Sequence, residues 1–107
     1  MTISENFVDK YSSIQYKNLQ SKNLEAAKNL MIDSVGNIIA SIRAGGNNEL
    51  IQNMANNLGD NNRMSPLYLG MLIHSLDFDD THYDALIHTG AITVPAAIYS
   101  SFNKKIN

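Results

Sequence analysis

The sequence predicts an all-α fold of four to five helices. Apolar residues recur at spacings of three and four along much of the chain, and this spacing places side chains on one face of a helix. Residues that start and stop helices flank these segments. Alternation of apolar and polar residues, which marks a half-buried strand, is nearly absent, and "AITV" (residues 91–94) is the one strand candidate. A length of 107 residues fits one domain, predicted over residues 1–107.

A first helix is predicted near the N-terminus, in the segment "SENFVDKYSSIQ" (residues 4–15). Ser4 is the expected N-cap, because a serine hydroxyl accepts a hydrogen bond from the free backbone N–H groups of a first turn. Helical spacing gives this segment one apolar face, made of Phe7, Val8, Tyr11 and Ile14.

The longest predicted helix covers residues 22–44, with Ser21 as N-cap and Gly45-Gly46 as stop signal. Its apolar stripe consists of Leu24, Ala27, Met31, Val35, Ile38 and Ile42, and Leu30, Ile32 and Ile39 widen it, as expected for a helix that neighbours cover on more than one side. Asp33 and Gly36 stand out within it, since a mid-helix glycine costs about 1 kcal/mol relative to alanine. Close helix packing at Gly36 and a solvated or capped Asp33 are the structural explanation.

Three further helical segments follow. The segment "NNELIQNMANNLG" (residues 47–59) predicts a helix that ends at Gly59 and turns Leu50, Ile51, Met54 and Leu58 inward. A turn, "GDNNR", comes next. Ser65 and Pro66 then fit the N-cap and first position of a helix that reaches about residue 76 and is apolar on nearly every side. A last helix is predicted to start near Pro95 in "VPAAIYSSF".

Composition excludes several classes of protein. Apolar residues make up 44% of the chain and charged residues 17%, as in a globular protein. The net charge is −2 and the eight lysines and arginines form no basic stripe, so we expect no nucleic-acid partner. The absence of cysteine excludes disulfides and thiolate chemistry. No apolar run approaches the roughly 18 residues of a membrane span, and no signal peptide is recognisable, so we expect a cytoplasmic protein without a membrane partner.

The segment "HSLDFDDTHYDALIHTG" (residues 74–90) gathers all three histidines and four of the ten acidic residues. If the preceding helix runs to about residue 76, Asp77, Asp79 and Asp80 lie at its C-terminal end, where the helix dipole disfavours negative charge. Asp79 or Asp80 could cap a short following helix, "THYDALIH" (residues 81–88). Capping explains one aspartate but not three, so a functional role and a structural one both remain open.

General acid–base chemistry fits this segment best, because a carboxylate and an imidazole in one partly desolvated pocket can exchange protons near neutral pH. Histidine and aspartate are also metal ligands, but no His pair at i, i+4 fixes a geometry, and no metal is predicted. No serine lies in a G-x-S-x-G elbow. Each histidine taken alone is more often a satisfied structural residue than a catalyst.

These residues resemble a known family. "HSLDFDDTH", followed by "HTGAITVPAA", closely resembles the signature of the MmgE/PrpD family, which includes 2-methylcitrate dehydratases, cis-aconitate decarboxylases and iminodisuccinate epimerases. "LMIDSVGNIIAS" is similar to another family segment and accounts for Asp33 and Gly36 together. The resemblance covers roughly residues 24–98. Leu69 stands where the family usually has asparagine, and Thr89 where it usually has proline.

The resemblance implies roles by position. Asp77, Thr81 and His88 correspond to active-site residues of family members, and His74, Asp80 and His82 to supporting positions. On a helix-like path Asp77 and Thr81 would share one face. Asp79 and Asp80 would mainly hold the loop, by capping and by orienting His82, and Asp79→Asn would cost little activity. Family enzymes need no metal or other cofactor and act on small di- and tricarboxylic acids.

The resemblance also sets the expected function. Family proteins are several times longer, so we expect a single truncated helical domain: the N-terminal portion of a lyase resembling 2-methylcitrate dehydratase, inactive as this short chain. Proton abstraction beside a carboxylate needs cationic or hydrogen-bonding groups, and no motif places Arg43 or Arg63 near the aspartates. The alternative is a small helical interaction module that reuses the fold without catalysis. Its exposed apolar faces would dock a partner or form a homo-oligomer.

Overall fold

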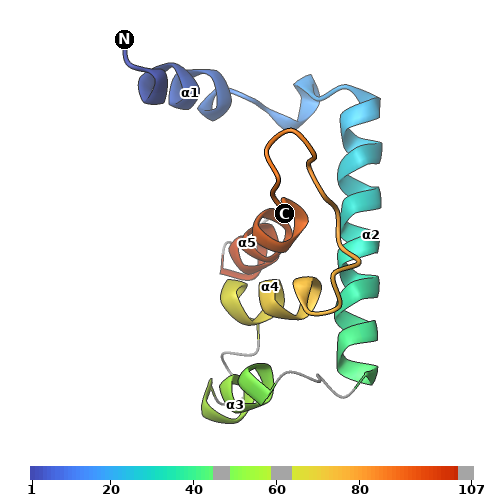
Figure 1. The fold of residues 1–107 in the computed structure, drawn as a ribbon. Coiled ribbons are helices and arrows are strands. Elements are labelled where there is room, and N and C mark those ends of the chain that lie inside the picture. Colours follow the sequence, from blue (N-terminus) through green and yellow to red (C-terminus); the bar gives the residue numbers. More distant parts are fainter. Residues whose placement is uncertain (45–48, 59–63, 104–107) are drawn as a thin grey trace.

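The computed structural model describes residues 1–44, 49–58 and 64–103. Within these ranges the chain forms five α-helices and one 3-10 helix, and no strand, so the predicted all-α fold is confirmed (Figure 1). "AITV" belongs to the first turns of the last helix and is not a strand. The elements are α1 (Ile3–Ser12), η1 (Tyr16–Asn18), α2 (Ser21–Arg43), α3 (Glu49–Leu58), α4 (Pro66–His74) and α5 (Gly90–Asn103).

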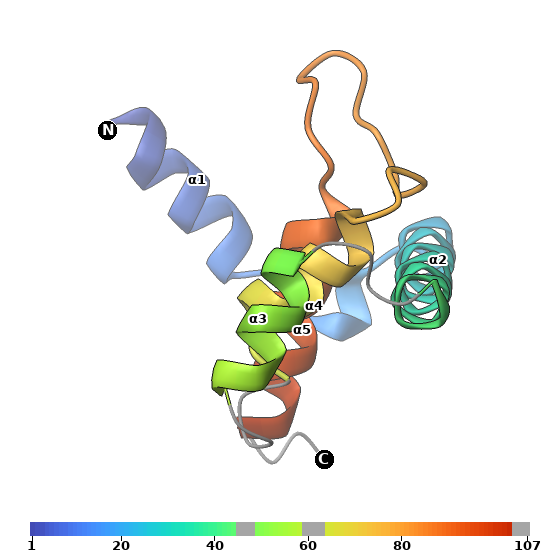
Figure 2. The same cartoon turned by 60° about the horizontal axis from the view of Figure 1, so that its bottom comes forward.

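Helix α4 lies at the centre of the fold and packs against α5, α2 and α3 (Figure 2). Its apolar character on nearly every side suits this position, and Leu69, Leu72 and Ile73 are buried. The predicted start is confirmed: Ser65 is the N-cap, its hydroxyl accepts from the Tyr68 N–H, and a proline occupies the first position. The helix ends at His74, two residues before the predicted end.

Helices α4 and α5 cross at a point where backbone meets backbone. A Cβ added to Gly70 would lie 2.5 Å from the carbonyl oxygen of Ala91. Pro95 has no N–H, so that carbonyl lacks its usual partner four residues later in α5. Helix α5 starts at Gly90, five residues before the predicted start near Pro95, so the proline lies inside the helix. Gly70 is required here because the released carbonyl occupies the space of its side chain.

Helix α2 contradicts the predicted core face. Its buried residues are small and polar: Ser34, Asn37 and Ser41. The Ser41 hydroxyl lies 2.6 Å from that of Ser75, directly after α4. Most of the predicted apolar stripe instead faces solvent, with Met31 44%, Val35 43% and Ile42 59% exposed. Periodicity identified the helix correctly but not the face that its neighbours cover.

Two details of α2 also differ from expectation, and a third agrees with it. Gln20 precedes the helix and Ser21 is its first residue, so Ser21 is not the cap. Nothing lies within 4 Å of a Cβ added to Gly36, so the expected close packing there is wrong. Asp33 is exposed and accepts a hydrogen bond from Asn37, as a solvated aspartate can.

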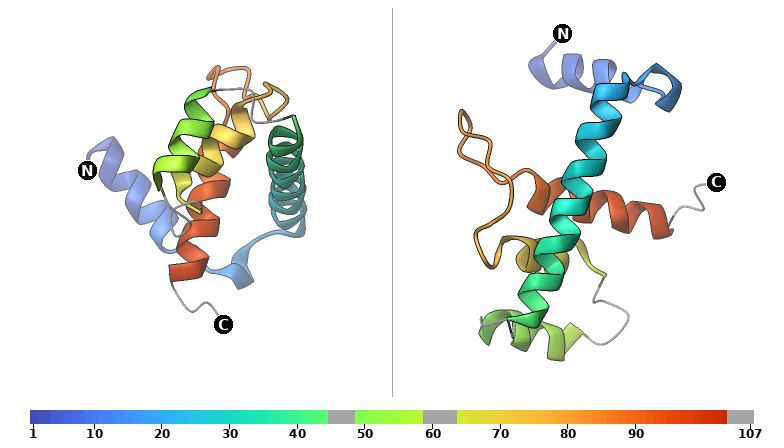
Figure 3. Two further views of the ribbon diagram at one scale, coloured as in Figure 1. Left: turned by 90° about the horizontal axis from the view of Figure 1, so that it is seen from below. Right: turned by 90° about the vertical axis from the view of Figure 1, so that its right-hand side faces the viewer.

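Helix α1 lies at the edge of the molecule and buries no residue (Figure 3). Thr2 caps it in place of Ser4: its hydroxyl accepts from the Glu5 N–H while the Glu5 carboxylate accepts from the Thr2 N–H. The predicted apolar face exists but is exposed, since Phe7 is 62% and Val8 59% accessible.

Helix α3 packs against α4 and buries Ile51, while Leu50, predicted to face inward, is 58% exposed. Met54 is half-buried as expected. The predicted stop at Gly45-Gly46, the inward side chain of Leu58, Gly59 and the turn after it lie outside the described residues. In the described part of the chain, no helix is both long and apolar enough to cross a bilayer.

Candidate active site

The segment between α4 and α5 is a loop, residues 75–89, called the α4–α5 loop below. The helix predicted for residues 81–88 is wrong. An isolated antiparallel bridge joins His82 to Ile87, and the turn between them carries Leu86 in the left-handed region, with φ 52°. In Figure 1 the loop runs beside α2 and then returns to the start of α5. Because its two ends meet at α4 and α5, residues far apart along the loop come together there.

Asp80 fixes one end of the α4–α5 loop. Its Oδ1 accepts the backbone N–H of Gly90 at 2.8 Å, and its Oδ2 accepts the hydroxyl of Thr89. A Cβ on Gly90 would collide with Oδ1 of Asp80. Asp80 therefore caps α5, as an aspartate at the favourable end of a helix dipole. An aspartate that follows the C-terminus of α4 in sequence lies at the N-terminus of α5 in space.

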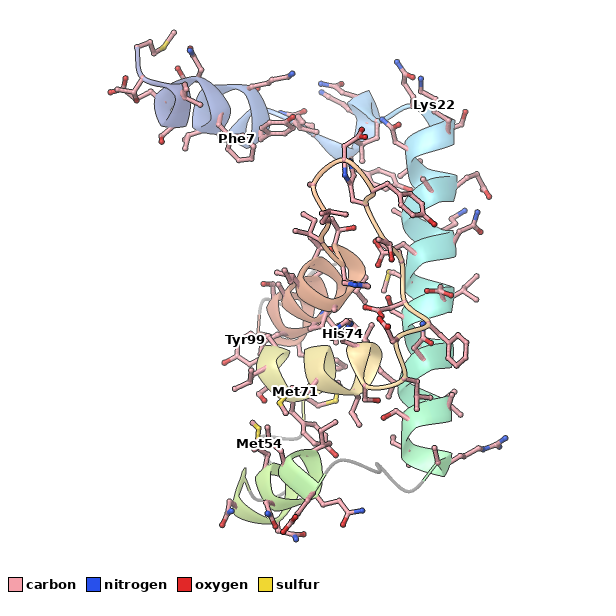
Figure 4. All side chains as sticks on the ribbon, in the orientation of Figure 1. Phe7, Lys22, Met54, Met71, His74 and Tyr99 are labelled. Carbon is pink, nitrogen blue, oxygen red and sulfur yellow. The ribbon has the colours of Figure 1, made fainter. Side chains whose placement is uncertain are left out.

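Asp79 lies between two histidines. Its side chain is only 1% exposed, and its carboxylate oxygens are 3.1 and 3.3 Å from Nδ1 of His74. Its Oδ2 is 3.4 Å from Nδ1 of His88, and the centroids of the two imidazole rings are 4.4 Å apart. Figure 4 shows the His74 side chain at the end of α4, where the loop begins.

Asp77 lies on the solvent side of the same group. Its φ of 57° is left-handed, and its N–H donates to the His74 carbonyl, closing the chain sharply after α4. Its side chain is 81% exposed, with Oδ1 4.0 Å from Nε2 of His88. His88 thus has a carboxylate near each ring nitrogen. Nδ1 of His88 is buried and within ion-pair distance of Asp79, but the angles do not make a hydrogen bond.

These contacts define a histidine–aspartate cluster of His74, Asp77, Asp79 and His88. Two of the three residues predicted as catalytic, Asp77 and His88, belong to it, and so does His74, predicted as supporting. The expectation missed the central place of Asp79. No local signal marked it, because the position of Asp79 depends on the sharp turn at Asp77 and on the loop that Asp80 closes onto Gly90.

Thr81 and His82 lie outside the cluster. Thr81 is exposed and has no described side-chain contact, and residues 77–81 are not helical, so Asp77 and Thr81 do not share a helix face. Nδ1 of His82 accepts the N–H of Ala85 at the far end of the loop. The described contacts of Asp79 and Asp80 go to other groups, so orientation of His82 by either aspartate is not found.

An open apolar groove of about 550 Å³ lies beside the cluster, between α4 and α5. Its walls include Leu67, Met71 and Ile92, and His74 and His88 are its polar members. In the described chain the ion-pair partners of Asp77 and Asp79 are histidines, and no lysine or arginine pairs with either. The arrangement can move a proton between imidazole and carboxylate, but it offers no permanent cation to an acidic ligand.

Comparison with protein-family models gives one match. The model described as MmgE/PrpD N-terminal domain matches residues 5–101, a span that contains the histidine–aspartate cluster and almost all of the five helices. Neither the curated proteins nor the solved structures yield a match.

Proposed function

This chain belongs to the MmgE/PrpD family, and from that premise we propose that it is the N-terminal portion of a lyase resembling 2-methylcitrate dehydratase. Its substrate would be a small di- or tricarboxylic acid, and its chemistry acid–base catalysis without a cofactor. The observation that carries this proposal is the position of His88, between the exposed Asp77 and the buried Asp79 at the end of an apolar groove.

His88 is suited to move a proton at Nε2. Nδ1 lies 3.4 Å from the buried Asp79 carboxylate, and a small rotation of the ring would let an Nδ1–H donate to it, so that Nε2 keeps its lone pair and faces Asp77. The base would remove a proton from the carbon beside a substrate carboxylate. The electron pair of that C–H bond would form the new double bond, and the departing hydroxide would take up a proton and leave as water. His88 and Asp77 share the roles of base and acid in this scheme.

Thr81 would donate a hydrogen bond to a substrate carboxylate or to the leaving hydroxyl. Its exposure beside Asp80 leaves its hydroxyl free for such a contact among the described residues. His74 and Asp79 would hold His88 in place, and Asp80 would hold the loop against α5. His82, at the far end of the loop, has no part in the proton transfer.

The described site is one wall of an active site. A substrate with two or three carboxylates would meet Asp77 and Asp79 without a paired lysine or arginine to offset the charge. Developing negative charge beside a carboxylate needs cationic or hydrogen-bonding groups. We therefore expect the 107 residues alone to show no turnover of 2-methylcitrate or cis-aconitate.

A chimera tests the proposal. This chain would be followed by the downstream segment of a family dehydratase, and water loss from 2-methylcitrate would be measured by the absorbance of the new double bond. We expect activity, and a fall of about 10²–10⁴-fold on His88→Ala, the usual range for losing a general acid or base. Asp84→Asn, on the exposed part of the loop, is the matched control. Undiminished turnover in the His88→Ala chimera would contradict the proposal.

An interaction module is the second candidate, and exposed apolar side chains favour it. They gather on α1, at Phe7 and Val8, and on the outer face of α2, at Ile32 and Ile42. Large apolar patches on a soluble protein often mark an interface. Native mass spectrometry and light scattering would show a discrete homo-oligomer if these faces pair. A monomer at all concentrations would contradict pairing.

A further inference from the structure

The histidine–aspartate cluster has the composition of a transition-metal site. One ligand atom from each of its four residues lies within 4.8 Å of the other three. The set combines two imidazoles with two carboxylates, and it comes from two places along the chain that meet at the ends of α4 and the loop. Imidazole and carboxylate together are typical ligands of zinc and neighbouring divalent ions, whereas magnesium and calcium prefer oxygen alone.

The distances within the cluster suit tetrahedral coordination. Oδ2 of Asp79 lies 3.3 Å from Nδ1 of His74 and 3.4 Å from Nδ1 of His88. Zinc ligands at about 2.0–2.2 Å from the ion lie roughly 3.3–3.6 Å from one another in a tetrahedron. An ion could therefore enter beside this oxygen, and the widest separation among the four ligand atoms, up to 4.8 Å, would have to close by about 1 Å.

The electrostatics of the cluster also favour a cation. The Asp79 carboxylate is 99% buried, and its partners are two imidazoles that are neutral unless protonated. Nδ1 of His88 is buried without a hydrogen-bond partner. A divalent ion would offset the buried charge and use that nitrogen's lone pair.

The ligands are held in place before any ion arrives. The N–H of Asp77 donates to the His74 carbonyl, and Asp80 binds Thr89 and Gly90, directly after His88. Both ends of the α4–α5 loop are therefore fixed, so binding an ion requires little ordering of the chain.

We propose that His74, Asp79 and His88, with the exposed Asp77 as fourth ligand, bind one divalent transition-metal ion of the zinc type. This binding does not depend on the proposed function. One consequence does rest on it: an ion at Nδ1 of His88 leaves the ring proton on Nε2, the nitrogen that would accept the substrate proton, so zinc would inhibit the lyase.

Isothermal titration of the untagged chain with zinc chloride, in a buffer that does not chelate metals, tests the proposal. We expect one site with a dissociation constant below about 0.1 mM and much weaker binding of magnesium. His88→Ala and Asp79→Asn should each weaken zinc binding tenfold or more. His82→Ala is the matched control, because it removes a histidine of the same loop outside the cluster, and it should bind zinc like the unchanged chain.

Nuclear magnetic resonance spectra of the histidine ring nitrogens test the same site in the unchanged chain. They need no variant, so a substitution that unfolds the protein does not affect the result. Zinc should shift the imidazole signals of His74 and His88 and leave those of His82 in place. Absent binding at about 1 mM zinc, or equal shifts at all three histidines, would overturn the proposal. A chimera that loses activity with a chelator would instead contradict the metal-free lyase and leave the zinc site standing.

Discussion

The base of the α4–α5 loop, where it joins the two helices, differs sharply from its tip, although both carry histidine and aspartate. At the base, Asp79 is buried and contacts two histidines, and Asp80 is bonded to the first turn of α5. At the tip, His82 and Asp84 are exposed and Tyr83 is 82% accessible. The same residue types therefore have different roles, and their contacts rather than their identity separate them.

This difference shows what an aspartate-rich motif contributes. The aspartates of the base hold two histidines and a helix terminus in fixed positions, whereas the tip only reverses the chain through the bridge between His82 and Ile87. Substitutions at the base should therefore change activity or stability, and substitutions at the tip should change neither.

The largest effect is expected for Asp79→Asn. Asparagine keeps the volume but loses the charge that orients His88 and His74. Turnover of the chimera should fall about 10²-fold or more, close to the effect of His88→Ala. The motif alone suggested a small cost at this position, and the structure revises that expectation. A loss of turnover of less than tenfold would mean that Asp79 only holds the loop in place.

Gly90→Ala should have the next largest effect, on stability. The added methyl group would collide with Oδ1 of Asp80 and lie 3.0 Å from Cδ1 of Leu30. Overpacking of this kind costs typically about 1–3 kcal/mol. Urea unfolding followed by circular dichroism would measure the loss, with Gly36→Ala as the control, because a methyl group there meets nothing within 4 Å.

Asp80→Ala should cost somewhat less, about 0.5–2 kcal/mol, the usual range for loss of a helix cap. Both this change and Gly90→Ala remove the same contact between Asp80 and the Gly90 N–H. The double variant should therefore lose less stability than the sum of the single ones. Additive losses would mean that the contact is absent in solution.

His82→Ala should have the smallest effect, within about 0.5 kcal/mol of unfolding free energy, as for most exposed positions. Its described contact is one hydrogen bond from the Ala85 N–H. Turnover of the chimera should also change less than for any substitution at the base. A loss as large as that of Asp79→Asn would show that the tip closes over the site.

Local signals in the sequence predicted the local parts of the structure. Ser65 and Pro66 start α4 as predicted, because capping depends on residues only three apart. Periodicity alone places the outward stripe of α2 in the core, because it does not say which face the neighbours cover. The site was predicted through Asp77 and His88 by resemblance to a family. The position of Asp79 could not be predicted, because it depends on a loop closed by contacts ten residues apart.

The crossing of α4 and α5 has a consequence for how the sequence can change over time. His74 lies one helical turn after Gly70, and His88 lies three residues before Ala91, so this crossing sets the separation of the two imidazoles. The carbonyl of Ala91 reaches Gly70 because Pro95 does not bond to it. The close approach at Gly70 therefore depends on Pro95 as well. In relatives we expect them to be kept or replaced together, although neither carries a functional group.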